Sequence, residues 1–142
     1  MFVREILKTK GSDVFTIRGD QSIDELAKEL VRRRIGAAVV VDRRGALIGV
    51  ISERDIVYAV AEHGVACLER KVADLMTADV ITCTPDTGIV EVMNQMTRRR
   101  IRHLPVIEDG RLAGLVSIGD VVKQRIASAE REAEQLRQYI TT

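Results

Sequence analysis

Cysteines, aromatic side chains and net charge are all scarce in this sequence, and each shortage excludes a class of protein. The 142 residues include 2 cysteines and 3% aromatic residues, and 22 basic against 21 acidic side chains leave a net charge of +1. Proteins that bind nucleic acids or anionic membranes through their overall field carry a basic excess, so neither partner is expected. Any anion site must be local.

The two cysteines do not form a metal-binding pattern. Cys67 and Cys83 belong to no CxxC pair, and only His63 and His103 could complete a zinc set, so a structural zinc site is not expected. A disulfide or reactive pair is the alternative. However, Cys83 lies in an apolar run typical of a strand, where a buried cysteine acts as a small hydrophobic side chain.

Long hydrophobic runs are also missing. No stretch reaches the roughly 18 uninterrupted apolar residues of a membrane span, and charged residues within the first ten positions leave no apolar core for a targeting signal. We therefore expect a cytoplasmic protein. Hydrophobic residues make up 46% of the chain and charged residues 30%, a balance typical of one folded domain of this length.

An internal repeat fills most of the chain. The second copy follows the first by 66 positions, and by 65 positions after one residue drops out of a turn. Such self-similarity predicts two structural units of the same kind. The matching segments are 14–17 with 80–83, 32–35 with 98–101, 45–52 with 110–117, and Asp55 with Asp120.

Each copy reads as a strand, a helix, a β-hairpin and a second helix. In the first copy, Ser22 and Glu25 make a capping box before a helix with apolar residues at helical spacing. The arginines at 32–34 complement the dipole at the end of that helix, with phosphate steering as the alternative. Apolar runs at 37–41 and 47–52 flank a polar turn and predict a hairpin buried on both faces.

One repeat could not cover its own sheet, so the two repeats are expected to pack around a shared core with approximate twofold symmetry. The fold class predicted is α+β, with a β-α-β-β-α order in each repeat. A longer helix follows the second repeat.

The sequences of both repeats resemble CBS motifs. RHLPV at 102–106 and GRLAGLVSIGD at 110–120 resemble the second half of such a motif, and GVISERD at 49–55 resembles the same segment of a first one. VADLMT at 72–77 resembles the lead-in to a second motif. The chain is thus similar to a tandem CBS pair, or Bateman module. The boundaries are motif 1 at 1–65, motif 2 at 66–125 and a helical extension at 126–142.

The resemblance implies a regulatory module without catalytic activity and without an obligatory cofactor. Clefts between its repeats would accept an adenosine-containing ligand such as AMP, ATP, NAD or S-adenosylmethionine, and binding would signal to an unidentified partner. By position, the Asp of each Ser-x-x-Asp segment would hold the ribose, the Ser would contact ribose or phosphate, and a threonine would lie beside the adenine. The candidate nucleotide-binding residues are Thr16, Ala37, Ser52, Arg54, Asp55, Thr82, Arg102, His103, Pro105, Ser117 and Asp120.

Physical chemistry supports these roles but leaves alternatives open. A carboxylate can accept from two ribose hydroxyls at once, and the N-terminus of a helix favours an anion. Equally, Ser-x-x-Asp before a helix is a variant of the capping box. Arg54 could reach a phosphate or stay solvated. The two sites are not equivalent, because the second copy has Arg102 and His103 where the first has Gly36 and Ala37.

The C-terminal extension carries apolar residues at alternating spacings of four and three, which is a heptad-like pattern. This stripe packs either on its own module or on a second subunit, and the resemblance implies a homodimer. The stripe consists of Val122, Ile126, Ala129, Ala133, Leu136 and Ile140.

Three other functions compete with the sensing module. A dimerisation scaffold would need no ligand. A DNA-binding regulator would need a further helix-turn-helix domain, for which the chain has no room. An enzyme would need a nucleophile with a base, paired carboxylates or a metal set, and the sequence shows no such constellation.

Overall fold

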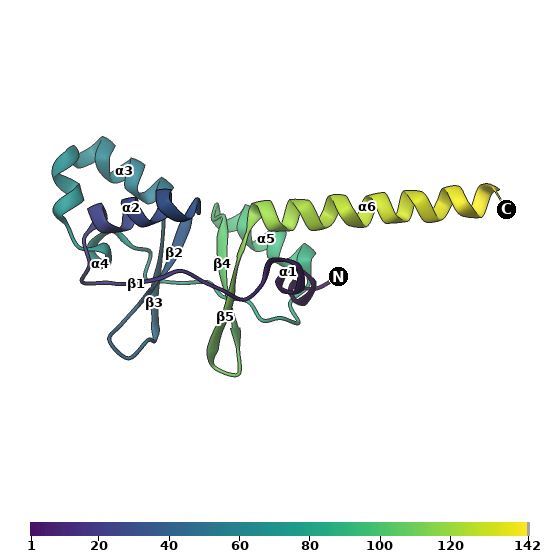
Figure 1. Ribbon diagram of the computed structural model, residues 1–142, viewed down its shortest axis with the longest axis horizontal. Helices are drawn as coiled ribbons and strands as arrows, with labels where there is room; N and C mark the ends of the chain where they lie inside the picture. Colours follow the sequence, from purple (N-terminus) through teal and green to yellow (C-terminus); the bar gives the residue numbers. More distant parts are fainter. Residues whose placement is uncertain (142) are drawn as a thin grey trace. The chain divides into compact units, whose positions relative to one another are not determined.

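In the computed structural model, which describes residues 1–141, the first repeat has a strand, a helix, a hairpin and a second helix, and the second repeat has the same order without the first strand (Figure 1). The first copy contains β1 (Thr16–Arg18), α2 (Ile23–Arg33), β2 (Ala37–Val41), β3 (Leu47–Ser52) and α3 (Glu53–His63). The second contains α5 (Ile89–Arg99), β4 (His103–Glu108), β5 (Arg111–Ser117) and α6 (Ile118–Thr141). Shorter helices are α1 (Val3–Lys10), η1 (Val65–Glu69, a 3₁₀ helix) and α4 (Val72–Leu75).

The chain forms two compact units, one around each sheet. We call residues 13–81 the first-repeat unit, and residues 1–12 with those from 82 onward the second-repeat unit. The first sheet has the order β1-β2-β3, with β1 parallel to β2 and β2 antiparallel to β3. The second sheet pairs β4 with β5 antiparallel. The strand expected at 80–83 is reduced to one parallel bridge between Cys83 and Val106.

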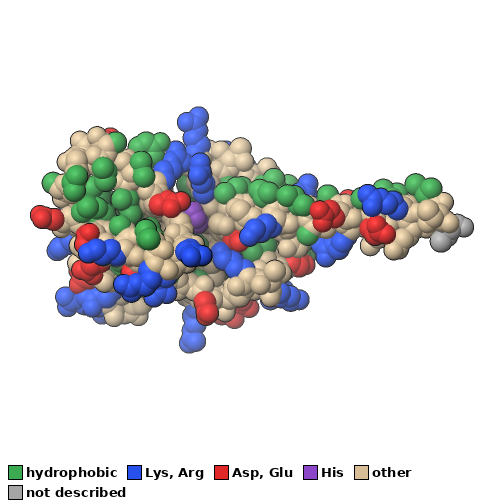
Figure 2. Space-filling model, turned by 45° about the horizontal axis from the view of Figure 1, so that its top comes forward, with side chains coloured by type: hydrophobic (Ala, Val, Ile, Leu, Met, Phe, Trp, Pro, Cys, Tyr) green, Lys and Arg blue, Asp and Glu red, His purple; other side chains and the backbone are tan. Residues whose placement is uncertain are grey.

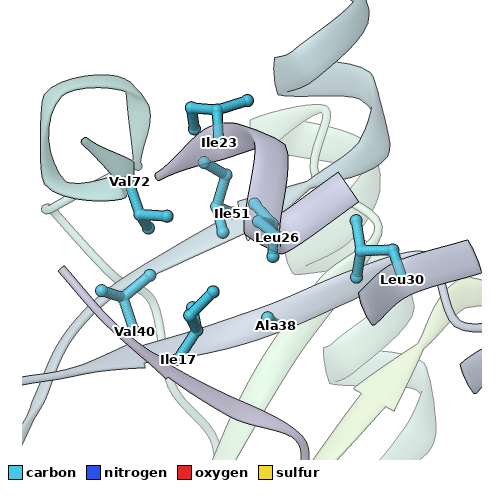
Figure 3. Close-up of a cluster of buried hydrophobic side chains, with 8 residues drawn as sticks. All are labelled: Ile17, Ile23, Leu26, Leu30, Ala38, Val40, Ile51 and Val72. Carbon is cyan, nitrogen blue, oxygen red and sulfur yellow. The ribbon is translucent and has the colours of Figure 1, made fainter. Parts of the chain in front are cut away.

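The core of the first-repeat unit lies between α2 and one face of its sheet. Figure 3 shows side chains from α2, the sheet and α4 pointing toward one another. Each fully buried Ile or Leu contributes about 1.5–3 kcal/mol of transfer free energy. Residues 37–40 are all buried, as expected, whereas in β3 only Gly49 and Ile51 are buried, so the expectation that both strands of the hairpin are buried on both faces is met by β2 and not by β3. The cluster consists of Ile17, Ile23, Leu26, Leu30, Ala38, Val40, Ile51 and Val72.

Helix α2 begins at the predicted serine cap, but only the serine half of the capping box expected from Ser22 and Glu25 forms. The hydroxyl of Ser22 accepts the backbone N–H of Glu25 at 3.1 Å, so Ser22 is the N-cap. The carboxylate of Glu25 accepts from the side-chain amide of Gln21 at 2.8 Å. At the other end, Arg34 adopts the left-handed conformation with φ 54°, and Arg100 does the same after α5 with φ 55°.

The short helices before each repeat dock in the same way on the two sheets. Helix α1, which precedes the first repeat in the chain, packs in the second-repeat unit, while α4 packs in the first-repeat unit. Matching backbone N–H groups donate to matching carbonyls at 2.8–3.0 Å. The donor and acceptor pairs are Val3 to Thr87 and Val72 to Gln21, then Ile89 to Met1 and Ile23 to Arg70.

A glycine in each sheet makes room for these lead-in helices. A Cβ added at Gly114 would lie 2.5 Å from a methyl carbon of Leu7, and one added at Gly49 would lie 2.5 Å from the sulfur of Met76. Val3 and Ile6 of α1 are buried within the second-repeat unit. The sequence therefore places each lead-in helix on the sheet of the other repeat.

Candidate functional site

Ser52 and Asp55 form a reciprocal cap at the start of α3. The backbone N–H and the hydroxyl of Ser52 donate to Oδ2 of Asp55 at 2.8 and 3.1 Å, and the backbone N–H of Asp55 donates to Ser52 Oγ at 3.4 Å. This is a capping box, and it satisfies N–H groups that the first helical turn cannot pair internally. The capping interpretation of the sequence is thus confirmed for this copy.

Ser117 and Asp120 repeat the cap at the start of α6, with one addition. The Ser117 backbone N–H donates to Oδ2 of Asp120 at 2.9 Å, and the Asp120 N–H donates to Ser117 Oγ at 3.1 Å. The ammonium of Lys10 also donates to Oδ2 of Asp120 at 2.7 Å, and to the backbone carbonyl of Leu115 at 2.7 Å. The last residue of α1 therefore ties the second carboxylate to the end of β5.

The protonation of Asp120 reflects these contacts. Burial by itself raises the pKa of Asp120, but the hydrogen bonds from Lys10 and Ser117 outweigh it, so the pKa lies below the ordinary value of 3.8. Only 18% of the side chain is exposed. Asp120 is accordingly an ionised acceptor at neutral pH.

Strand register brings most of the predicted residues of the first repeat to one face of its sheet. Ala37 pairs with Ser52, and Thr16 pairs with Val39, two residues along β2 from Ala37. Because side chains alternate between faces along a strand, Thr16, Ala37 and Ser52 share the face opposite the α2 core. Thr16 is exposed, Ser52 half-buried and Ala37 buried.

The second sheet carries the same arrangement. His103 pairs with Ser117, and Pro105 lies two residues along β4 from His103. The Cys83 N–H donates to the carbonyl of Pro105 at 3.0 Å, which sets Thr82 beside this end of β4. Leu104 and Val116 face the core, so His103, Pro105 and Ser117 share the opposite face.

The backbone confirms which residues of the two copies are equivalent. Glu53 donates to the carbonyl of Gly36 at 2.9 Å, and Ile118 donates to that of Arg102 at 2.9 Å. Arg102 thus stands where the first copy has Gly36. The second copy has an exposed cation at a position where the first has no side chain.

At another position it is the first copy that carries a cation the second lacks, Arg54. It is exposed in the first turn of α3, with its guanidinium carbon 5.4 Å from the centre of the Tyr58 ring and its Nη2 3.4 Å from the Tyr58 hydroxyl. The corresponding residue of α6 is Gly119. Each helix N-terminus thus has an arginine close in the chain or through a backbone hydrogen bond: Arg54 of α3 itself in the first copy, and Arg102, the residue before β4, in the second.

Other parts of the described chain offer less chemistry. A groove of about 450 Å³ in the second-repeat unit is lined by α1 and the β4–β5 hairpin, among them Arg4, Lys8 and Glu108, and by none of the predicted site residues. Within residues 1–141 no three His, Cys, Asp or Glu side chains are grouped so as to hold a metal ion. Nor does any helix in that range have the length and apolar character needed to cross a membrane.

The repeats match a known family over most of the chain. The model of the CBS domain matches residues 3–62 and again residues 72–126. The chain belongs to the CBS domain family. Both matches begin at a lead-in helix, α1 or α4, and both include a Ser-x-x-Asp cap.

Similar CBS proteins are known from plants and bacteria. The mitochondrial CBS domain-containing protein CBSX3 of Arabidopsis thaliana is 35% identical over 97% of this chain and 71% of its own length. The crystal structure of the CBS-domain containing protein ATU1752 from Agrobacterium tumefaciens is 48% identical, covers 87% of this chain and 92% of its own, and gives a TM-score of 0.85.

A third similar protein was solved with ligands. The CBS domain pair of protein MJ0100, in complex with 5′-methylthioadenosine and S-adenosyl-L-methionine, is 29% identical with a TM-score of 0.79. The match covers 90% of this chain and 98% of that one. Both of those ligands contain adenosine.

Lys10 is not among the residues predicted from the sequence for this region. A signal was available, because the repeat extends further toward the N-terminus than the aligned segments. Val-Arg-Glu-Ile-Leu at 3–7 corresponds to Val-Ala-Asp-Leu-Met at 72–76, which identifies α1 as the lead-in of the first repeat. At the same offset, Lys10 corresponds to Asp79, an acidic residue.

Proposed function

We propose that this CBS pair is a regulatory module that binds an adenosine-containing ligand at its Ser-x-x-Asp caps and performs no chemistry itself. The observation that carries the proposal is the duplicated cap: in each copy a carboxylate is held at the N-terminus of a helix, on the strand end where the predicted residues gather. The adenosine ligands of the MJ0100 pair support the same ligand class.

The cap leaves the carboxylate suited to a ribose. Ser52 and Ser117 donate to Oδ2 of their aspartates. We assign the second oxygen, Oδ1, to the two ribose hydroxyls, because charge-assisted hydrogen bonds are roughly twice as strong as neutral ones. A ligand that forms them would also meet a helix N-terminus, which favours its phosphate or other anionic group.

The remaining candidates take supporting roles. We assign Thr16 and Thr82 to the adenine side, with Ala37 and Pro105 as the apolar surface of their sheets. Arg102 and His103 would meet a phosphate in the second copy, and Arg54 would do so in the first. AMP, ATP and NAD are the ligands we favour, and the different placement of these cations predicts that the two copies bind with different affinity.

Calorimetry on the whole chain tests the proposal. We expect AMP, ATP, NAD, S-adenosylmethionine or methylthioadenosine to bind the wild type, and Asp120→Asn or Asp55→Asn to weaken binding at its own copy by about 1.5–3 kcal/mol, the value of a hydrogen bond to a charged group. Asparagine keeps an acceptor for the serine N–H, so the cap survives. Glu53→Gln removes one charge beside Asp55 without touching the cap, and should bind like the wild type.

Two outcomes would contradict the proposal. One is a wild type that binds no adenosine compound between micromolar and millimolar concentration. The other is an equal loss of affinity in Glu53→Gln and Asp55→Asn, which would make the effect one of general charge. Mass spectrometry of small molecules released from the purified protein identifies the ligand without a prior choice.

Signalling requires a recipient. We propose that ligand binding changes the affinity of this module for a regulated protein, since a ligand shifts a conformational equilibrium by its difference in affinity for the two states. We also propose a cytoplasmic location and a homodimeric state, as the resemblance to tandem CBS pairs implies.

A further inference from the structure

Helix α6 is longer than its own unit can cover. It contains 24 residues, about 36 Å at 1.5 Å per residue. It extends beyond α5 and the β4–β5 hairpin in Figure 1. Only Val121 is buried, and residues 129–141 are all exposed. A helix as short as the exposed segment 129–141 is only marginally stable in water by itself, so we expect another surface to pack on this half of α6.

The face of α6 that packs on its own unit is not the face that carries the apolar stripe. Val121 is buried and Gln124 and Ser128 are half-buried, a spacing of three and four that marks the packed face. The stripe starts one residue later and follows a heptad, with Ile126, Ala133 and Ile140 at a and Val122, Ala129 and Leu136 at d. In this numbering Val121 and Ser128 are at c and Gln124 is at f, which lie on the opposite side of the helix from a and d.

The stripe is therefore exposed. Ile126 is 54% exposed, Leu136 61% and Ile140 78%. Figure 2 shows hydrophobic side chains along the near part of the projecting helix and again near its end, with acidic and basic side chains between and beside them. An exposed apolar stripe bordered by charges is typical of a surface that another helix covers.

Charges beside the stripe identify the covering helix. Arg125 and Glu132 occupy g positions, and Glu130 and Arg137 occupy e positions. In a parallel two-stranded coiled coil, a g residue lies next to the e residue five positions later on the partner. Two copies of α6 in register would thus pair Arg125 with Glu130 and Glu132 with Arg137, each twice by symmetry.

An antiparallel pair with full overlap would oppose like charges instead. There g positions face g and e positions face e, so Glu132 would meet Glu132 and Glu130 would meet Glu130. Lys123 would meet Arg137. Like charges at such positions are unfavourable, whereas opposite charges at e and g select partner and orientation.

We propose that α6 forms a parallel, in-register coiled coil with α6 of a second copy of this chain. The stripe from Val122 to Ile140 is the seam, and the exposed Arg137, now 3.4 Å from Glu134 of its own helix, is shared with Glu132 of the second copy. The small Ala129 and Ala133 make the centre of the seam its weakest part. This interface does not depend on the proposed nucleotide function.

Sedimentation equilibrium of the full chain without ligand tests the seam. We expect a dimer for the wild type and at least a tenfold weaker association for the Leu136→Glu, Ile140→Glu double variant. Arg131→Glu, a change at an exposed f position, is the matched control and should leave the dimer intact. Ala133→Ile should tighten the dimer on the order of tenfold, because it buries more apolar area at an a position. Circular dichroism checks that the variants keep their fold.

Orientation has its own tests. Glu132→Arg should weaken the dimer, and adding Arg137→Glu should restore it, because only the parallel register places these residues together. Leu136→Cys should cross-link across the seam in an oxidised glutathione buffer, whereas Arg131→Cys should not. The native Cys67 and Cys83 are buried and should not interfere.

Several results would overturn the proposal. They are a monomeric wild type, a dimer that the stripe variants leave unchanged, and a Glu132→Arg variant that associates as well as the wild type. Equal cross-linking of Leu136→Cys and Arg131→Cys would overturn it as well.

Discussion

The ammonium of Lys10 lies 2.7 Å from Oδ2 of Asp120, the oxygen that also accepts the backbone N–H of Ser117. This contact joins the first helix of the chain to the last. The cap at Asp55 has the same hydrogen bond from its serine N–H. The residue that corresponds to Lys10 after the second lead-in helix is Asp79, which has the opposite charge. The two copies of the cap therefore differ in charge for a reason that lies outside the Ser-x-x-Asp motif.

The ion pair should appear as a coupling between two positions 110 residues apart. Lys10→Met and Asp120→Asn should each lower the free energy of unfolding, and a double-mutant cycle should give a coupling of about 1 kcal/mol, the upper range for a partly exposed pair. Urea denaturation of the four proteins measures it. The same cycle with Asp55→Asn in place of Asp120→Asn should be additive, and coupling there would contradict the assignment.

The pair also predicts how stability depends on pH. The pKa of Asp120 is lower in the folded protein than its ordinary value of 3.8, so the folded state favours the ionised carboxylate. Its contribution is fully present above that ordinary value and disappears as the pH falls through the folded pKa. The difference in unfolding free energy between wild type and Asp120→Asn should therefore shrink on acidification from pH 6 toward pH 2. A difference that grows instead would reverse the sign of the shift.

Sequence reasoning predicted the repeated elements well because repetition tests each assignment twice. Strands 37–41 and 47–52 have the predicted bounds, and Gly45 in the polar turn between them has a φ of 83°. The prediction of a strand at 80–83 was wrong, because only Cys83 of that segment pairs with β4. A short apolar run indicates an extended chain, but the number of ladder bonds depends on the neighbouring strand.

Other features were beyond a reading of local pattern. Helix α1 has eight residues, too few for a clear periodicity, and its place is set by contacts with residues about 80 to 110 positions away. For Ser52 and Ser117 the sequence left two interpretations open, a helix cap and a ligand contact. The structure confirms the caps, while the ligand contacts stay a prediction.

The glycines beneath the lead-in helices should differ in their tolerance of a side chain. A Cβ at Gly49 would lie 2.9 Å from the backbone oxygen of Thr77 as well as close to Met76, whereas the three atoms nearest to a Cβ at Gly114 all belong to the side chain of Leu7. Backbone cannot rotate away, so Gly49→Ala should cost about 1–3 kcal/mol and Gly114→Ala clearly less. Thermal denaturation compares them. A larger loss for Gly114→Ala would show that α1 is the more rigidly docked helix.

Arg34 and Arg100, which follow α2 and α5, both have a positive φ, and replacing Arg34 by glycine should stabilise the protein. Arg34 has φ 54° and ψ 45°, a conformation that costs a residue with a Cβ about 1–2 kcal/mol. Part of this is recovered in Arg34→Gly, after the greater chain entropy of glycine is subtracted, so we expect a gain of about 0.5 kcal/mol. Arg32→Gly, two residues earlier inside α2, should instead lose about 1 kcal/mol. Equal effects of the two changes in chemical denaturation would contradict this account.

The thiol of Cys83 should be unreactive while the protein is folded. Cys83 is 6% exposed, and burial raises its pKa to about 11, with the nearby charge of Glu91 acting in the same direction. At pH 8 roughly one thiol in a thousand is then a thiolate, which is the form that attacks a disulfide reagent. Cys67 is also a free, buried cysteine.

We therefore expect a thiol-reactive disulfide reagent at pH 8 to label neither cysteine in the native protein and both in guanidinium chloride. The labelling rate in dilute denaturant should follow the population of opened molecules, because reaction requires exposure of the side chain. Cys83→Ala keeps a small apolar residue at this position and leaves Cys67 as the only reporter, so the two rates can be separated. Rapid labelling of Cys83 in the native protein would mean that the bridge between Cys83 and Val106 opens without unfolding of the unit, and that this short connection, rather than the β4–β5 ladder, limits the local stability of the second sheet.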